Sequence, residues 1–390
     1  MYDAIVIGAR CAGASTAMLL ARRGYRVLLV DKTAFPSDIP HGHFIHRHGP
    51  ARMRKWGVLD RLTEAGSPAI TTFHTDFDDF PITGRNLVFE GVPAAYAPRR
   101  VVLDKLLVDA AVDAGAELRE GFIVEDLLFD GDRVIGMRGR SGDGRTITDY
   151  ASITIGADGR NSRVARAVHA PLTEAAPTVC CWYFSYWTDV SAEGLYAYAR
   201  RDHAIFAFPT DHGLFGVFIG WSIDRLPVVR ANLEREFMNA VLAEKSFGER
   251  VVAGRRAERY YGATDMPNFL RKPYGPGWAL VGDAGCHKDP FLALGICDAF
   301  RDAELLADTC HRGLSGPGLD RVMPEYERLR NEATLPDYHW NLDSARFMPS
   351  PADLQQLRRA VQGDEEATHR YFAAIEGHLP FDAVQPLVRA

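Results

Sequence analysis

A short glycine-bearing turn near the N-terminus has the residue types and spacing that hold a phosphate group. It runs Gly8-Ala-Arg-Cys-Ala-Gly13, between a predicted buried strand at 4–7 and a predicted Ala/Leu-rich helix at 14–23. Gly8 permits a tight turn, Gly13 permits close packing of helix on strand, and the start of the helix offers backbone N–H groups. Asp31 ends the next predicted strand, where a carboxylate can hold ribose hydroxyls. We therefore predict a Rossmann-type dinucleotide site.

The turn departs from the usual Gly-x-Gly-x-x-Gly pattern because Arg10 replaces its middle glycine. That glycine normally lets the backbone approach the pyrophosphate, so Arg10 is expected to point outward and add a cationic contact to the phosphates. Cys11 and Ala12 complete the predicted phosphate turn, and Lys32 follows the predicted ribose carboxylate. The alternative is an ordinary strand-to-helix turn that binds no ligand.

Two later motifs favour the ligand-binding alternative. Asp158-Gly159 follows one predicted buried strand, and Gly282-Asp283 follows another at 278–281. The carboxyl ends of parallel strands meet at the edge where such sheets bind ligands. Either aspartate alone could cap a turn. All three motifs, in this order, predict a single bound nucleotide.

Together these motifs resemble those of flavoprotein hydroxylases of the para-hydroxybenzoate hydroxylase type, whose relatives include geranylgeranyl reductases and flavin-dependent halogenases. The resemblance covers residues 1 to about 320 and includes Pro290, Gly295 and the pair Asp298-Ala299. It implies bound FAD, with Asp283 on the ribityl hydroxyls. It also implies that the Asp158-Gly159 pair lies near the pyrophosphate and the reduced nicotinamide.

The resemblance assigns further contacts and also shows departures. It implies that Arg100 lies near the flavin and that backbone around Val124 contacts the adenine side. After the family's proline, Leu292 replaces a glycine and Cys297 an asparagine, which changes the expected dioxygen pocket. The Trp-x-Trp-x-Ile-Pro signature of halogenases is absent, so halogenation is not expected.

The implied fold class is α/β: a Rossmann-type FAD-binding fold (glutathione-reductase-like) with an inserted antiparallel β-sheet substrate domain and C-terminal helices. Aromatic-rich predicted strands between about 178 and 223 support the inserted sheet. The predicted boundaries are 1–75, 99–177 and 273–320 for a discontinuous FAD-binding domain, 76–98 and 178–272 for the substrate domain, and 321–390 for a C-terminal helical segment.

Composition limits the classes of partner. The formal net charge of −6 and the scattered arginines argue against nucleic-acid binding. No apolar run is long enough to span a membrane, and the chain starts directly on a predicted strand without a signal peptide. The six cysteines show no disulfide-framework spacing, so we expect a reducing, cytoplasmic setting. The sequence leaves the oligomeric state open and is compatible both with a homodimer and with a separate reductase partner.

Four histidines alternate in the stretch His41-Gly-His-Phe-Ile-His-Arg-His48. Imidazoles bind zinc or iron, but no cysteine or carboxylate pattern accompanies these, so no metal site is predicted. The resemblance places this stretch close to the flavin ring. His43 and His46 are therefore the candidate catalytic residues, and solvated loop histidines are the alternative.

The inserted sheet carries aromatic side chains that could line an apolar substrate cavity. Excluding water there would protect a reactive flavin intermediate, although simple packing of the sheet is the alternative. The candidate substrate residues are Trp182, Phe184, Phe206, Phe208 and Phe218.

The function that the resemblance implies is an FAD-dependent monooxygenase of secondary metabolism. NAD(P)H and O2 would serve to hydroxylate or epoxidise an apolar small molecule, such as an aromatic one, through a flavin C4a-hydroperoxide. One alternative is an FAD-dependent reductase or dehydrogenase of the geranylgeranyl-reductase type. The other is a non-catalytic flavin-binding redox protein.

Overall fold

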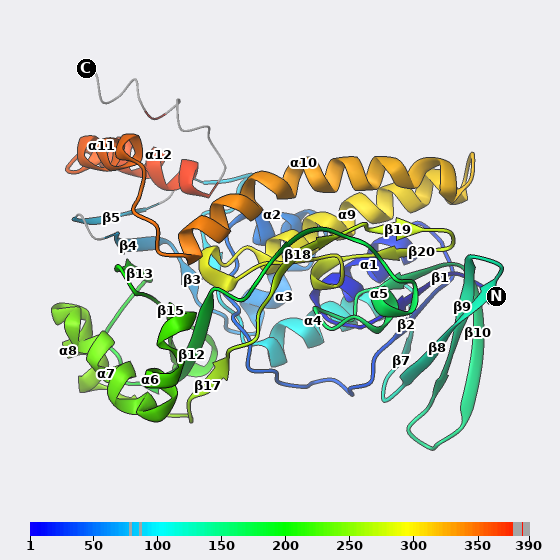
Figure 1. Cartoon of the computed structure of the whole chain (residues 1–390), viewed down its shortest axis with the longest axis horizontal. Coiled ribbons are helices and arrows are strands. Elements are labelled where there is room, and N and C mark those ends of the chain that lie inside the picture. The colour runs from blue at the N-terminus through cyan, green and yellow to red at the C-terminus, as the bar shows by residue number, and fades with distance from the viewer. Residues whose placement is uncertain (78–79, 86–87, 377–383, 385–390) are drawn as a thin grey trace. The chain divides into compact units, whose positions relative to one another are not determined.

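The computed structural model describes residues 1–77, 80–85, 88–376 and 384, and the chain divides into two compact units (Figure 1). The first unit comprises Met1–Gly42, Arg99–Pro177 and Pro267–Trp340. The second comprises His43–Pro98, Thr178–Met266 and Asn341–Ala390. Residues 43–75, predicted with the FAD-binding domain, belong to the second unit. The roles assigned to the predicted domains stay predictions.

A largely parallel sheet forms the centre of the first unit. Its strands lie in the order β19 (Tyr274–Gly275), β20 (Trp278–Leu280), β10 (Thr146–Gly156), β1 (Tyr2–Ile7), β2 (Val27–Val30) and β7 (Glu117–Arg119). All neighbours are parallel except β19 and β20, which are antiparallel. The last four residues of β1 and all four residues of β2 are apolar and buried, as expected for strands covered on both faces. The predicted α/β architecture is confirmed.

Strand β10 corrects one prediction. The sequence changes from polar alternation at 145–150 to an apolar run at 152–157, which predicts two separate strands, but the structure has one strand, Thr146–Gly156. Its polar first half pairs antiparallel with β9 (Arg133–Arg140), which pairs with β8 (Ile123–Asp130). Its apolar second half pairs parallel with β1. No turn residue separates the halves, so the strand continues from one environment into the other.

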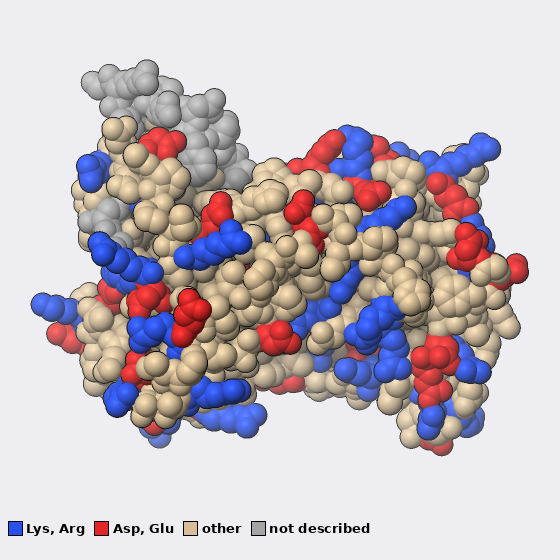
Figure 2. Space-filling model, viewed as in Figure 1, with Lys and Arg blue, Asp and Glu red and all other residues tan. Residues whose placement is uncertain are grey.

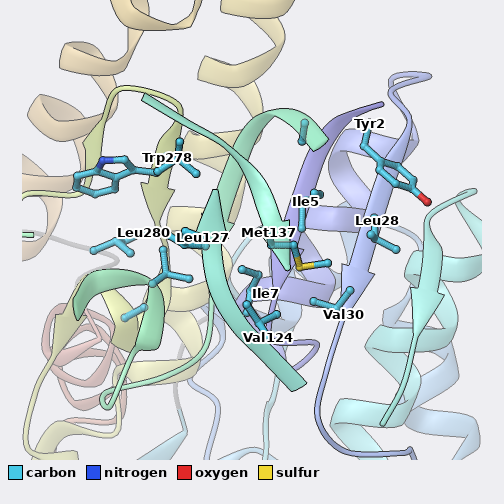
Figure 3. Close-up of a cluster of buried hydrophobic side chains, with 14 of the residues drawn as sticks. Tyr2, Ile5, Ile7, Leu28, Val30, Val124, Leu127, Met137, Trp278 and Leu280 are labelled. Atoms are coloured by element: carbon cyan, nitrogen blue, oxygen red, sulfur yellow. The ribbon is translucent and has the colours of Figure 1, made fainter. Parts of the chain in front are cut away.

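Side chains of β1, β2, β8, β9 and β20 form a continuous core in the first unit (Figure 3). Ile5 and Leu28 are fully buried at its centre, and Met137 of β9 packs over them. Helix α1 (Cys11–Ala21) packs against both α4 (Arg100–Asp113) and α9 (Gly295–Leu314). This packing fixes the start of α1 relative to the strand ends.

The remaining elements of the first unit are short or peripheral. They are α5 (Arg163–Ala167), β11 (Leu172–Ala176), β18 (Asn268–Arg271), η3 (Gly282–Ala284), β21 (Cys286–His287), η4 (Pro290–Leu292) and most of α10 (Leu319–Ala345).

The second unit is built on another sheet, in which the short strand β17 (Tyr261–Ala263) pairs with the long strand at Cys180–Thr188. Its order is β16 (Arg255–Arg256), β12 (Cys180–Thr188), β15 (Phe215–Ser222), β14 (His203–Pro209), β13 (Leu195–Ala199), β4 (Thr72–Asp76) and β5 (Pro81–Arg85). The predicted inserted sheet is thus confirmed, with one departure from antiparallel pairing. Strands β13 and β4 are parallel, and the β4–β5 hairpin, which comes from an earlier part of the chain, forms this edge of the sheet.

Helices cover one face of this second sheet. They are α6 (Leu226–Ala231), α7 (Leu233–Ala243) and α8 (Lys245–Ala253), which bury Trp187, Ile219 and Trp221. The other elements of the unit are α2 (His48–Lys55), α3 (Leu59–Glu64), β3 (Ala69–Ile70), β6 (Ala95–Tyr96), η1 (Asp211–Gly213), η2 (Ile223–Arg225), α11 (Ala352–Val361) and α12 (Glu365–Ile375). The predicted C-terminal helices are therefore present.

Acidic and basic side chains are interspersed on the face shown in Figure 2. Among the helices of the described residues, none combines the length and apolarity needed to cross a membrane.

Candidate functional site

The three sequence motifs meet in the first unit. Strands β1, β10 and β20 are adjacent and end together, with Ile7 opposite Gly156 and Gly156 opposite Leu280. A Cβ placed on Gly13 would lie 1.7 Å from the carbonyl oxygen of Gly8 and 3.0 Å from the Cβ of Ala157. The turn after β1 therefore contacts the end of β10 at van der Waals distance.

The third motif, Gly282-Asp283, lies beside the same turn at the start of α1. Gly282 follows β20 in the left-handed region (φ +61°), and a Cβ there would lie 2.7 Å from the Cβ of Ala12 at the start of α1. Asp283 follows it, half-buried. The structure thus brings together the three predicted segments from distant parts of the sequence.

The start of α1 lacks a side-chain cap. Its N-cap residue Arg10 makes no capping hydrogen bond, and the first turn holds no acidic residue. The first N–H groups of a helix, with the positive end of the helix dipole, suit an anion. These features fit a phosphate group at the turn.

Asp31 links the end of β2 to the same turn. Its Oδ2 accepts a hydrogen bond from the Ala9 N–H at 2.8 Å, and its Oδ1 accepts one from the Thr33 N–H at 2.8 Å. Each carboxylate oxygen keeps a second lone pair for a hydroxyl group. The neighbouring Lys32 is exposed. Asp31 is thus fixed in orientation and able to accept a ribose hydroxyl.

Arg10 does not point freely outward, contrary to the expectation from sequence. Its guanidinium pairs with the buried carboxylate of Asp104 on α4, which also accepts two hydrogen bonds from Arg100, at 2.7 and 3.1 Å. The thiol of Cys11 lies 3.5 Å from Asp104 Oδ1, and burial raises its pKa to about 12, so it stays neutral. Asp104 was missed from sequence, although its i,i+4 spacing from Arg100 is a helix-pairing signal.

His41 is close enough to the Arg10–Asp104–Arg100 cluster for its charges to affect the histidine's pKa. Burial, and then the positive charge of Arg100, lower its pKa to about 4, while Asp283 acts in the opposite direction. The residue nevertheless retains solvent-accessible surface. Both charged groups that influence it, Arg100 and Asp283, belong to the predicted cofactor set.

Asp158 has one oxygen occupied and one available. Its Oδ2 accepts hydrogen bonds from the N–H groups of Arg163 (2.6 Å) and Val164 (3.2 Å), whereas its buried Oδ1 has no partner among the described residues. Gly159 leaves open space beside it. The Val124 carbonyl, predicted to face the adenine, accepts a hydrogen bond from the Arg163 guanidinium at 2.8 Å. The second lone pair of the Val124 carbonyl oxygen can accept a hydrogen bond from a ligand.

The predicted flavin loop follows Asp283. Pro290 begins η4 and is exposed, and Gly295 begins α9 with open space around its Cα. An ion pair between Lys288 and Asp298, with 2.6 Å between Nζ and Oδ2, joins the residues just before and just after the loop. This pair fixes the base of the loop.

The donor and acceptor set of the first unit fits a dinucleotide such as FAD. The uncapped start of α1 suits a pyrophosphate, Asp31 suits a ribose, and the unpartnered Asp158 Oδ1 accepts a hydrogen bond. The individual assignments to FAD atoms stay predictions.

In the second unit, the predicted substrate residues share one face of the sheet. The opposite face packs on α6–α8, as Trp187 and Phe215 show. Phe184 stacks on Phe218 at 4.6 Å between ring centroids, and Phe218 stacks on Phe208 at 5.1 Å. Trp182 and Phe206 continue this set at 5.9 Å. We call these five residues the aromatic face.

His43 is buried against the aromatic face and uses both ring nitrogens. Its Nδ1 lies 2.9 Å from the Ala97 carbonyl oxygen, and its Nε2 lies 2.8 Å from the Tyr186 hydroxyl. Because a carbonyl only accepts, Nδ1 carries a proton, and in the neutral ring Nε2 accepts from Tyr186. Tyr186, which was not among the predicted site residues, is thereby joined to His43.

His46 lies in a different environment. Its Nδ1 is 3.1 Å from Glu376 Oε1, while Glu376 Oε2 accepts hydrogen bonds from the buried Arg47 guanidinium at 2.7 and 2.9 Å. The two candidate catalytic histidines therefore have separate partners. Among the described residues, no group of three or more His, Cys, Asp or Glu side chains is placed to hold a metal.

His48 makes stability depend on pH. Burial, and then the nearby His46, lower its pKa to about 4 from 6.5. The unfolded chain binds this proton below about pH 6.5 and the folded chain does not, so stability is lost as pH falls towards 4, by about 3 kcal/mol over the window. We expect His48→Gln to flatten this loss, measured by urea unfolding across that range. An unchanged slope in the variant would contradict the assignment.

Comparisons with known proteins agree with the geometry. Residues 1–334 match the family model described as FAD binding domain. The chain is 26% identical to the digeranylgeranylglycerophospholipid reductase of Methanosarcina acetivorans over 371 residues, covering 88% of this chain and 83% of the relative.

Solved structures share the fold. A myxobacterial chondrochloren halogenase superposes with a TM-score of 0.78 at 22% identity, covering 98% of this chain and 91% of that one. A probable FAD-dependent monooxygenase from Pseudomonas aeruginosa superposes with a TM-score of 0.76 at 18% identity, covering 90% and 97%. At such identities the likeness establishes the architecture alone. With the family match over most of its length, the chain belongs to the FAD binding domain family of para-hydroxybenzoate hydroxylase type and is an FAD-dependent oxidoreductase.

Proposed function

We propose that the protein is a monooxygenase that uses NAD(P)H and O2 to hydroxylate or epoxidise an apolar small molecule. The observation that carries the proposal is the one-sided aromatic face, with the hydrogen-bonded pair of His43 and Tyr186 against it. An apolar surface with a single polar pair suits an apolar substrate that carries one polar group.

Bound FAD supplies the redox chemistry of the reaction. Around it, the start of α1 and Arg10 would bind the pyrophosphate, Asp31 the adenosine ribose and Asp283 the ribityl hydroxyls. Asp158-Gly159, Arg100, Val124, Pro290 and Gly295 would complete the cofactor contacts. The aromatic face would orient the substrate and exclude water, which protects reactive species.

His43 and Tyr186 would hold the proton of the reacting polar group. The Ala97 carbonyl fixes the imidazole tautomer, so that Nε2 can take a proton from the Tyr186 hydroxyl at 2.8 Å. The tyrosine oxygen can then take a proton from a substrate hydroxyl. His46, held by Glu376, remains a weaker candidate for this role.

Tyr186→Phe tests this pair. We expect kcat to fall by about a hundredfold, the lower range for loss of a positioned acid–base group, with FAD content unchanged. Tyr183→Phe is the matched control, because Tyr183 lies on the same strand but on the face covered by helices. Steady-state kinetics with the best substrate from the assay below would measure both, and equal rates in wild type and Tyr186→Phe would remove Tyr186 from the chemistry.

A second candidate is a reductase of carbon–carbon double bonds, favoured by the named activity of the Methanosarcina relative. The non-catalytic alternative is set aside because the similar proteins are named as a reductase, a halogenase and a monooxygenase.

One assay separates the two candidates. The FAD-loaded protein is supplied with NADH or NADPH, isotopically labelled dioxygen, and a panel of aromatic and polyprenyl compounds. A monooxygenase gives products that contain one labelled oxygen atom, and only in the presence of dioxygen. Saturated products without label, formed equally well without dioxygen, would replace the proposal with the reductase.

A further inference from the structure

The C-terminal helix α12 packs directly on the edge of the second unit's sheet (Figure 1). A Cβ placed on Gly84 of β5 would lie 2.5 Å from Thr368 Cγ2 and 3.3 Å from Phe372 Cε2, both side chains of α12. The approach of this helix to the sheet is therefore as close as a glycine allows.

A row of aromatic rings leads from α12 to the aromatic face. Phe372 meets Phe73 of β4 edge-on, with 5.5 Å between ring centroids, and Phe73 lies 6.5 Å from Phe44. Phe44 in turn lies 5.4 Å from Phe208, a member of the aromatic face that also contacts His43 at 5.5 Å. Phe372 is thus the outer end of a continuous row of buried aromatic rings.

Buried charges fix the end of the same helix. Glu376, directly after α12, accepts hydrogen bonds from Arg47 and lies 3.1 Å from His46. The side chains of Arg47 and Glu376 are each 1% exposed. Desolvating two charges is costly unless their geometry is well defined, so this contact holds α12 in one position. Its partners lie three and four residues after His43.

The match to the FAD binding domain family ends at residue 334, before α11 and α12. These helices lie outside that match and belong to the unit that carries the aromatic face.

We propose that α12 sets the size of substrate that the aromatic face accepts, with Phe372 as the specificity-determining residue and Glu376 as the positioning residue. The proposal rests on the proposed function, because it takes the aromatic face as the substrate surface. A shorter side chain at position 372 would open space beside the buried Phe73 ring, so larger ring systems would gain room at that end of the row.

The test compares equilibrium binding of naphthalene and phenanthrene to the FAD-loaded protein, measured by quenching of probe fluorescence. Phe372→Leu is expected to raise phenanthrene affinity relative to naphthalene by about tenfold, the scale on which apolar pockets discriminate size. Phe247→Leu is the matched control: Phe247 is equally buried but packs on the opposite, helix-covered face, against Tyr196. It should leave the ratio unchanged.

Glu376→Gln provides a second variant that keeps every aromatic ring. Because it loosens α12, Glu376→Gln is also expected to raise phenanthrene affinity relative to naphthalene. It therefore tests the proposal even if Phe372→Leu folds poorly. If the wild-type protein binds both probes and neither variant changes the affinity ratio, the role of α12 is overturned but the aromatic face can still be the substrate surface. Wild-type protein that binds neither probe would overturn the aromatic face as a substrate surface, and with it this proposal.

Discussion

Gly13→Ala is expected to yield protein that no longer retains FAD. The added Cβ would lie 1.7 Å from the Gly8 carbonyl oxygen, so the backbone of the turn must move. Overpacking of this kind costs about 3 kcal/mol, which corresponds to roughly a hundredfold in affinity if the displaced turn is the pyrophosphate site. The ratio of flavin to protein absorbance after gel filtration measures the loss.

Gly142→Ala is the control for this substitution. Gly142 has ordinary backbone geometry, and its nearest neighbour to an added Cβ is the Gly121 carbonyl oxygen at 3.7 Å. It should retain flavin as wild type does. Full FAD content in Gly13→Ala would show that the cofactor does not bind at this turn.

Asp104→Asn is expected to destabilise the apoprotein by about 3 kcal/mol. The change keeps the shape of the side chain but leaves the buried Arg100, and Arg10 beside it, without their carboxylate. Removing one partner of a buried ion pair is costly because the remaining charge is uncompensated. Since the proposed pyrophosphate would lie beside Arg10, added FAD should recover part of the loss.

Thermal and urea unfolding, each with and without FAD, would measure both parts of this prediction. Asp109→Asn on the same helix is the control, because its pair with Lys105 is about half exposed and should contribute less than about 1 kcal/mol. Equal stability of Asp104→Asn and Asp109→Asn would contradict the account of the Arg10–Asp104–Arg100 cluster.

The features that could be predicted from sequence are those that depend on neighbouring residues. Gly8, Gly13 and Asp31 indicate a strand–turn–helix–strand unit, and Asp158 and Asp283 mark the ends of buried strands. Because parallel strands end at one edge, these local signals sufficed to bring the motifs together. The aromatic-rich strands between about 178 and 223 likewise indicated the inserted sheet.

Long-range partners could not be predicted in this way. Nothing in the sequence near His46 indicates Glu376, which is 330 positions away. The pairing of Arg10 with Asp104 was missed because the two residues are 94 positions apart in the sequence. Strand β10 was divided in error because a change from polar alternation to an apolar run resembles a boundary.

Titration of FAD into flavin-free wild-type protein tests the central claim most directly, with flavin fluorescence and calorimetry as readouts. The account predicts saturable binding of one FAD per chain, which Gly13→Ala weakens by roughly a hundredfold and Gly142→Ala preserves. A folded wild-type chain that stays colourless in excess FAD would contradict it.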